Sequence, residues 1–183
     1  FASAMLLRNL RQLERKINNV STITKPSQWS QYASTASHYS AADHARKKEF
    51  VWRVVQEIHP ANVLDIGANT GTYSMLAAES GARVIALDTD LAAIDQLWKL
   101  ALKDSRNILP LLVNIARPSP ALGWENSESI SFLDRAEQRF DLVMMLAVIH
   151  HLFLLAPLPG APIASLAARL TARHLLIEWV PQS

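Results

Sequence analysis

The stretch Val63-Leu64-Asp65-Ile66-Gly67-Ala68-Asn69-Thr70-Gly71 decides the fold class that this sequence predicts. Its first four residues are mostly apolar, which is typical of a strand that is covered on both faces of a sheet. Two glycines lie in the next five residues, and glycine allows the backbone to turn sharply. The stretch therefore predicts a strand that passes through a tight turn into a helix.

The alternation of strand and helix continues along the chain. Apolar runs predict further strands at 84–87, 108–113, 142–146 and 175–180. Helices are expected at 71–79, closed by Gly81, at 91–102, capped by Asp90, and at 163–170. A long loop is expected at 114–139, with a short helix at 131–138. This order favours an α/β fold with a doubly wound, mostly parallel sheet and right-handed crossovers.

An N-terminal extension is predicted before this pattern. Leu6, Leu10 and Leu13 recur at helical spacing, so a helix is expected over 3–19. The segment 21–39, rich in Ser, Thr and Gln, is expected to be a linker or a lid, and its residues Trp29, Tyr32, His38 and Tyr39 either cover the site or only pack against the protein. The chain is thus divided into residues 1–39, the helix with its lid or linker, and residues 40–183, the core.

The core is expected to begin with a helix from Ser40 to about Ile58, with Asp43 in its first turn and Pro60 after its end. Its buried stripe is predicted to contain Phe50, Val54, Val55 and Ile58. Its basic residues Arg46, Lys47 and Lys48 are expected on a solvated face rather than beside an anionic group.

Length and composition limit the class of protein. The 183 residues suit one domain, and half of them are hydrophobic. The absence of cysteine excludes disulfides and thiolate metal sites, and it fits a cytoplasmic location. No apolar run reaches the roughly 18–20 residues of a membrane span, and no secretory signal is recognisable. We therefore expect no membrane partner.

Charge is unevenly distributed, although the net charge is only +2. Residues 1–59 carry nine Lys/Arg and four Asp/Glu, whereas residues 60–183 carry nine Lys/Arg and twelve Asp/Glu. A basic N-terminal segment could meet an anionic partner such as nucleic acid. A solvated helix face explains the same charges and is favoured, so a nucleic-acid partner is kept as an alternative.

Ligands of doubly wound sheets bind beyond the carboxyl ends of the strands. The first such end is the glycine turn 67–71, and the N-terminus of the next helix offers N–H groups to an anion. Asp88 ends the next strand, 21 residues after Gly67, where a carboxylate can accept hydrogen bonds from both hydroxyls of a ribose. These features indicate a ligand with an adenosine-type sugar and an anionic tail.

The glycine spacing disfavours dinucleotides. The fingerprint Gly-x-Gly-x-x-Gly uses its middle glycine for approach of a pyrophosphate, and Asn69 occupies that place here. No Gly-Lys-Ser/Thr follows, which disfavours a Walker-type phosphate loop. An NAD-dependent oxidoreductase on a similar sheet is kept as an alternative function.

Four sites in the correct order resemble the class I S-adenosylmethionine (SAM)-dependent methyltransferases. The stretch 63–71 is similar to the first motif of that family, and Asp88 and Asn114 match its ribose and adenine positions. Phe140-Asp141-Leu142-Val143, followed by His150-His151, is similar to its fourth strand. Residues 114–120, 123–124, 131–135 and 177–181 further resemble a bacterial subgroup of nodulation-type or uncharacterised methyltransferases.

The resemblance implies SAM as the cofactor. The glycine turn would hold the methionine moiety, Asp88 the ribose, and Asn114 the adenine, where the family often has Asp. The implied cofactor-binding residues are Asp65, Gly67, Ala68, Asn69, Gly71, Asp88, Thr89, Asn114, Ile115 and Leu146. The family fold has seven strands, so the core is expected to lack the last two, which would leave its fifth strand as an exposed edge.

The candidate catalytic residues are His150 and His151, after the fourth strand, and Glu178, which ends the fifth. Histidine is a base near neutral pH, but methyl transfer needs a base only where the nucleophile must lose a proton. Alignment of the nucleophile with the methyl group supplies much of the rate. Glu178 is expected to orient the acceptor or to pair with a lid cation. No metal site is expected, because adjacent His side chains on a helix diverge.

The methyl acceptor is left open by the sequence. No Asn-Pro-Pro-Tyr-type motif follows the fourth strand, which disfavours methylation of nucleic-acid amino groups. A small molecule and an RNA both stay candidates. A non-catalytic SAM-binding or interaction module is a further alternative to an enzyme.

Overall fold

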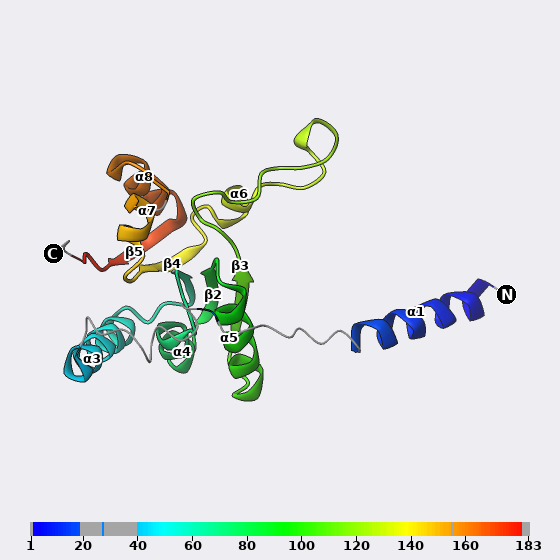
Figure 1. Ribbon diagram of the computed structural model, residues 1–183, viewed down its shortest axis with the longest axis horizontal. Helices are drawn as coiled ribbons and strands as arrows, with labels where there is room; N and C mark the ends of the chain where they lie inside the picture. Colours follow the sequence, from blue (N-terminus) through cyan, green and yellow to red (C-terminus); the bar gives the residue numbers. More distant parts are fainter. Residues whose placement is uncertain (1, 19–26, 28–39, 155, 181–183) are drawn as a thin grey trace.

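The computed structural model describes residues 2–18, 27, 40–154 and 156–180 (Figure 1). Its centre is a sheet of β1 (Asn62–Ile66), β2 (Arg83–Asp88), β3 (Ile108–Leu112), β4 (Phe140–Met145) and β5 (Thr171–Ile177). The strands lie in the order β3-β2-β1-β4-β5, and each neighbouring pair is parallel. All carboxyl ends therefore share one edge, and the strand order reverses between β1 and β4, the topological switch point. The predicted doubly wound sheet is confirmed.

Helices cover both faces of the sheet, because successive side chains of a strand point to opposite sides. On one face, Val63 and Met144 belong to a core formed with α3 (Ala41–Ile58), α4 (Thr72–Glu79) and α5 (Leu91–Lys103). On the other face, Leu64 and Met145 belong to a core formed with α6 (Phe132–Ala136), α7 (Ile149–Leu154) and α8 (Gly160–Leu170). Figure 1 shows these helix layers below and above the sheet.

The start of α3 is where the sequence predicts it. The Asp43 N–H donates to Ser40 Oγ at 3.1 Å, and the Ser40 N–H donates to the Asp43 carboxylate at 3.2 Å, which forms a capping box. The predicted buried stripe is wrong at Phe50, whose surface is 46% exposed. Val51 and Val55 are fully buried, because residues four apart share one helix face.

The C-terminal part departs most from the prediction. β5 begins at Thr171, four residues earlier than expected, directly after α8. Its polar residues Arg173 and His174 are exposed, since β5 pairs with β4 alone among the described strands and forms an edge of the sheet. α7 was not predicted as a separate helix, because its residues continue the apolar run of β4.

Two further elements lie outside the layers. α1 (Ala2–Asn18) is separate from the sheet, and η1 (Trp124–Asn126) belongs to the long loop between β3 and α6 (Figure 1). Within the described ranges, no helix combines the length and apolarity needed to cross a bilayer. The predicted lid residues Trp29, Tyr32, His38 and Tyr39 lie outside the described residues.

Gly71 opens α4 in the left-handed region, with φ 85°. A Cβ at this position would lie 2.2 Å from Cδ1 of Leu97, a fully buried residue of α5. Replacing Gly71 with Ala is therefore expected to lower the free energy of unfolding by about 2 kcal/mol, through backbone strain and overpacking. Urea denaturation measures the loss.

Gly81 provides the matched control, because it too has a positive φ, 94°, but an added Cβ would meet no atom within 4 Å. Gly81→Ala is expected to cost only the backbone strain, about 1 kcal/mol. Equal losses in the two variants would contradict the packing explanation for Gly71.

Candidate functional site

Five predicted side chains lie at the carboxyl edge of the sheet, and we call them the rim cluster. Asp65 and Asp88 lie at the ends of β1 and β2, His150 and His151 lie in α7 after β4, and Glu178 follows β5. The Glu178 N–H donates to the Met145 carbonyl at 3.1 Å, which aligns the end of β5 with that of β4. The parallel sheet thus brings together residues that are up to 113 positions apart in the sequence.

The glycine turn uses its backbone donors within the protein. Four N–H groups are engaged: those of Gly67 and Ala68 with the Leu87 carbonyl, that of Gly71 with the Ala68 carbonyl, and that of Asn69 with Asp88 Oδ2. The N–H groups expected to serve an anion are those of the first turn of α4, and these four bonds do not engage them. A ligand can approach this backbone closely, but these four groups are not a row of free donors for a phosphate.

The glycines are required by the protein's own packing. A Cβ on Gly67 would lie 2.8 Å from Cγ2 of Val148, in the connection between β4 and α7. Ala147, its neighbour, has a φ of 54°, and Asn69 in the facing turn has a φ of 50°. Such conformations cost free energy and cluster at functional sites. The absence of a side chain on Gly67 therefore lets the turn after β1 pack against Val148, in the connection after β4.

The Asp88 carboxylate is fixed by two backbone donors. Its Oδ2 accepts from the Asn69 N–H at 2.8 Å, and its Oδ1 accepts from the Asp90 N–H at 2.9 Å. Each carboxylate oxygen can accept a second hydrogen bond, so one acceptor site per oxygen is left for a ligand. This half-buried, oriented carboxylate matches two neighbouring ribose hydroxyls.

Next to it, Asp90 caps α5 as predicted: its Oδ1 accepts from the Ala92 N–H at 2.8 Å. Its other oxygen accepts a hydrogen bond from Ser27 Oγ. The one described residue of the segment 19–39 therefore contacts the loop that carries Asp88.

Asp65 is a buried acid, with only 2% of its surface exposed. Ser74 Oγ, on α4, donates to its Oδ2 at 2.6 Å. Burial raises the pKa of the Asp65 carboxyl to about 6, against the opposing hydrogen bond from Ser74. Within that net value, the Asp88 charge acts in the same direction as burial, and the Lys47 charge acts against it. A second acid beneath the glycine turn suits a positively charged group of a ligand.

The His150 and His151 rings are neighbours, with centroids 4.0 Å apart and planes tilted by 42°. Burial lowers the pKa of both imidazoles below the ordinary 6.5, while Glu178 acts in the opposite direction on His150 and Asp88 on His151. Nδ1 of His150 is buried and has no hydrogen-bond partner among the described residues. An imidazole that is neutral near pH 7 is suited to accept a proton.

Glu178 is expected to orient the acceptor or to pair with a cation of the lid. It does pair with a cation, but this cation is Lys47, which lies on α3. Lys47 Nζ is 2.6 Å from Glu178 Oε2, and both side chains are about one-fifth exposed. The same ammonium lies 4.9 Å from the centre of the Tyr73 ring, a cation–π contact. The prediction that Lys47 is solvated is wrong. Arg46, in contrast, is exposed and pairs with Asp43.

The other implied cofactor residues have varied surroundings. Ala68 and Leu146 are buried in the core beside α3 and α4, and Ile115 is buried in the opposite core. Asn114 is exposed, and its Oδ1 accepts from the Ala116 N–H at 2.9 Å, while Thr89 is exposed after β2. The Asn69 side chain has a buried Oδ1 without a partner in the described part of the chain.

Sequence reasoning missed Ser74, Tyr73 and Lys47 as members of the site. Ser74 could have been found, because it lies one helical turn after Gly71 and faces the strand end. Lys47 had no local signal, since its partner Glu178 is 131 positions away.

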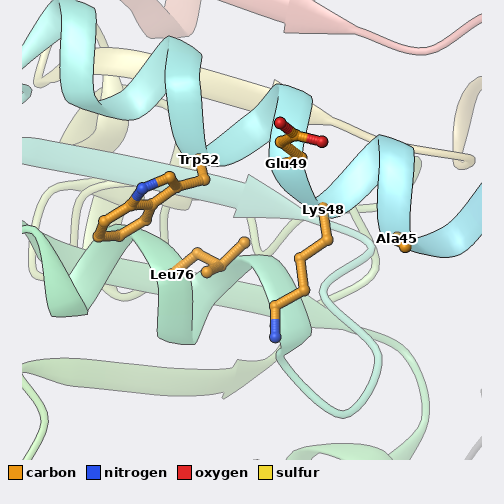
Figure 2. Close-up of a pocket in the computed structure, with 5 residues that line it drawn as sticks. All are labelled: Ala45, Lys48, Glu49, Trp52 and Leu76. Atoms are coloured by element: carbon orange, nitrogen blue, oxygen red, sulfur yellow. The ribbon is translucent and has the colours of Figure 1, made fainter.

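A surface depression of about 310 Å³ lies between α3 and α4, and none of its lining residues belongs to the rim cluster. It is lined by Ala45, Lys48, Glu49, Trp52 and Leu76 (Figure 2). Figure 2 shows the Trp52 ring over Leu76, with Lys48 extending beside α4. None of these residues was predicted to bind a ligand.

Comparison with known proteins identifies the family. The methyltransferase domain family matches residues 8–170. The chain is 32% identical to Nodulation protein NoeA of Rhizobium meliloti (strain 1021) over 161 residues, which are 87% of this chain and 33% of that protein. The chain therefore spans about a third of the length of the curated relative that it matches.

Solved structures share the fold. The bifunctional kinase-methyltransferase WbdD has a TM-score of 0.58 at 19% identity, over 92% of this chain and 35% of that chain. TehB from Haemophilus influenzae has a TM-score of 0.52 at 18% identity, over 81% of this chain and 44% of that chain. A methyltransferase from Geobacter sulfurreducens has a TM-score of 0.55 at 11% identity, over 91% and 78% of the two chains. These identities show a common fold and no more.

Proposed function

This chain belongs to the methyltransferase domain family, and we propose on that premise that it binds SAM at the rim cluster and transfers the methyl group to a separate acceptor. The observation that carries the proposal is the Asp88 carboxylate, oriented by two backbone N–H groups at the switch point. SAM ends in an adenosine whose ribose presents two neighbouring hydroxyls, and this carboxylate has an acceptor site for each.

The rim cluster also fits the other end of SAM. The methionine moiety carries an ammonium and a carboxylate, and the rim offers the acid Asp65 and the cation Lys47 close to each other. The buried Oδ1 of Asn69, on the turn between β1 and α4, is a further acceptor near this end. Opposite charges at one edge support a zwitterionic ligand.

The same geometry favours SAM over NAD. A pyrophosphate needs free N–H donors and positive charge, but the turn donates four N–H groups within the protein.

In the proposed reaction, SAM supplies an electrophilic methyl group on its sulfonium. Asp88 holds the ribose, and the turn between β1 and α4 positions the cofactor beside α7. The His150 imidazole accepts the proton of an acceptor that must lose one. Glu178, which lies close enough to influence the pKa of His150, stabilises the imidazolium that forms.

Replacing His150 with Gln is expected to lower the rate of methyl transfer at least about tenfold, because general-base catalysis contributes roughly 10²–10⁴-fold. Since burial lowers the pKa of His150, the wild-type rate should be constant near pH 7.5 and fall only when the pH drops through a value below 6.5. Rates from pH 5 to 8, with SAM affinity measured separately, check both statements. An unchanged pH profile in the variant would rule out this role.

The test of the proposal is incubation with methyl-labelled SAM and fractionated bacterial extract. Label is expected in one fraction, either small molecules or RNA, and ribonuclease treatment separates the two. The basic N-terminal segment supports RNA as the acceptor. If the small molecules gain label and the RNA does not, RNA is excluded as the acceptor. SAM binding without transfer to any fraction would favour a non-catalytic module. The bacterial cytoplasm is the proposed location, supported by the bacterial relative.

A further inference from the structure

Lys47 occupies an unusual place for a helix-surface lysine. It reaches from α3 to the end of β5, where its Nζ lies 2.6 Å from Glu178 Oε2. It also lies over the Tyr73 ring in the first turn of α4, and its charge acts on buried Asp65 at the end of β1. One ammonium thus connects three elements around the switch point.

From this position we propose that Lys47 is the residue that binds the carboxylate of the methionine moiety of SAM, and that Glu178 occupies Lys47 until SAM arrives. The inference rests on the proposed function and adds a specific residue to it. Asp65 receives the ammonium of the same moiety, so the two charges of the ligand meet opposite charges of the protein.

The exchange of partners follows from burial. Lys47 is only 19% exposed, so an unpaired ammonium there would be costly, and Glu178 satisfies it. When the SAM carboxylate takes the place of the Glu178 carboxylate, Lys47 keeps an anionic partner at every stage. Glu178 moves away from Lys47 when the SAM carboxylate takes its place, and its charge, which already influences His150, continues to act on that ring. Glu178 is therefore a competitor of the SAM carboxylate.

The experiment compares SAM with decarboxylated SAM, which keeps the ammonium and lacks the carboxylate, by isothermal titration calorimetry at pH 7.5. Wild-type protein is expected to bind SAM about ten- to a hundredfold more tightly than the decarboxylated analogue, the usual effect of a charge-assisted hydrogen bond. Lys47→Met is expected to abolish this preference by weakening SAM binding alone. Glu178→Gln is expected to strengthen SAM binding severalfold.

Two further variants complete the design. Lys47→Arg keeps the charge and is expected to retain the preference for SAM. Retention in this variant shows that the loss in Lys47→Met comes from the missing charge and not from a folding defect. Lys48→Met is the matched control, because Lys48 is the next residue on α3 and is exposed. It is expected to leave both affinities unchanged.

Equal weakening of both ligands in Lys47→Met would overturn the inference and identify the Lys47–Glu178 pair as a structural link only. Weaker SAM binding in Glu178→Gln would contradict the competition. If neither ligand bound to the wild-type protein, the proposed function itself would fail, which distinguishes the two failures.

Discussion

Replacing Asp65 with Asn is expected to make the protein more stable and less able to bind SAM. Burial raises the pKa of this carboxyl from 3.8 to about 6, so the ionised form is disfavoured in the folded state. A shift of this size corresponds to up to about 3 kcal/mol of lost stability above pH 6. Asn is neutral and can still accept the hydrogen bond of Ser74 Oγ, so the variant avoids this loss.

The sign of the pH dependence follows from proton binding. Between about pH 4 and 6 the folded protein holds the Asp65 proton more tightly than the unfolded chain, so its contribution to stability falls as the pH rises. Asp65→Asn is expected to remove this fall. Urea denaturation at pH 4, 6 and 8 measures the effect.

Ser74→Ala is the control for the Asp65 environment. The Ser74 hydrogen bond lowers the pKa of Asp65, so its loss should destabilise the protein at pH 7.5, opposite to Asp65→Asn. SAM affinity of Asp65→Asn is expected to fall about tenfold, since the ammonium loses a charged partner. An Asp65→Asn protein that was less stable than the wild type at pH 8 would contradict this account of the buried acid.

Replacing Asp88 with Ala is expected to reduce SAM affinity at least a hundredfold. The carboxylate is proposed to accept both ribose hydroxyls, and each hydrogen bond to a charged group contributes about 1.5–3 kcal/mol. The same substitution leaves the Asn69 and Asp90 N–H groups without their acceptor, so the turn loses its support. Calorimetry with SAM and with S-adenosylhomocysteine measures the loss.

Asp90→Ala is the matched control for that variant. Asp90 lies two residues away and caps α5, so its replacement should cost about 1 kcal/mol of stability. It should change SAM affinity little, because the Asp90 side chain bonds Ala92 and Ser27 rather than the turn. Similar affinity losses in Asp88→Ala and Asp90→Ala would show that loop stability, not the ribose contact, controls binding.

The fold was predictable because its signals are local. The strands β1 to β4 are short apolar runs, and Ser40, Asp43 and Asp90 form the caps that their residue types favour. Asp65, Asp88, His150, His151 and Glu178 reach the carboxyl edge because a parallel sheet places all strand ends there.

What the sequence did not predict depends on tertiary contacts. The start of β5 was misplaced because Thr171 to His174 are polar enough for a loop, and only pairing with β4 makes them a strand. The hydrogen bonds that hold the glycine turn, from Gly67 and Ala68 to the Leu87 carbonyl and from Asn69 to Asp88, join the ends of two different strands and have no local signal. Lys47 was assigned to solvent because its partner comes from β5, and no local pattern relates the two.

The central claim is that the edge holding Asp65 and Asp88 is a SAM site. Calorimetric titration of the chain with SAM, S-adenosylhomocysteine and NADH tests it most directly. Binding of SAM and S-adenosylhomocysteine is expected, with loss of both in Asp88→Ala and no heat from NADH. Binding of NADH alone would contradict the claim and favour an oxidoreductase.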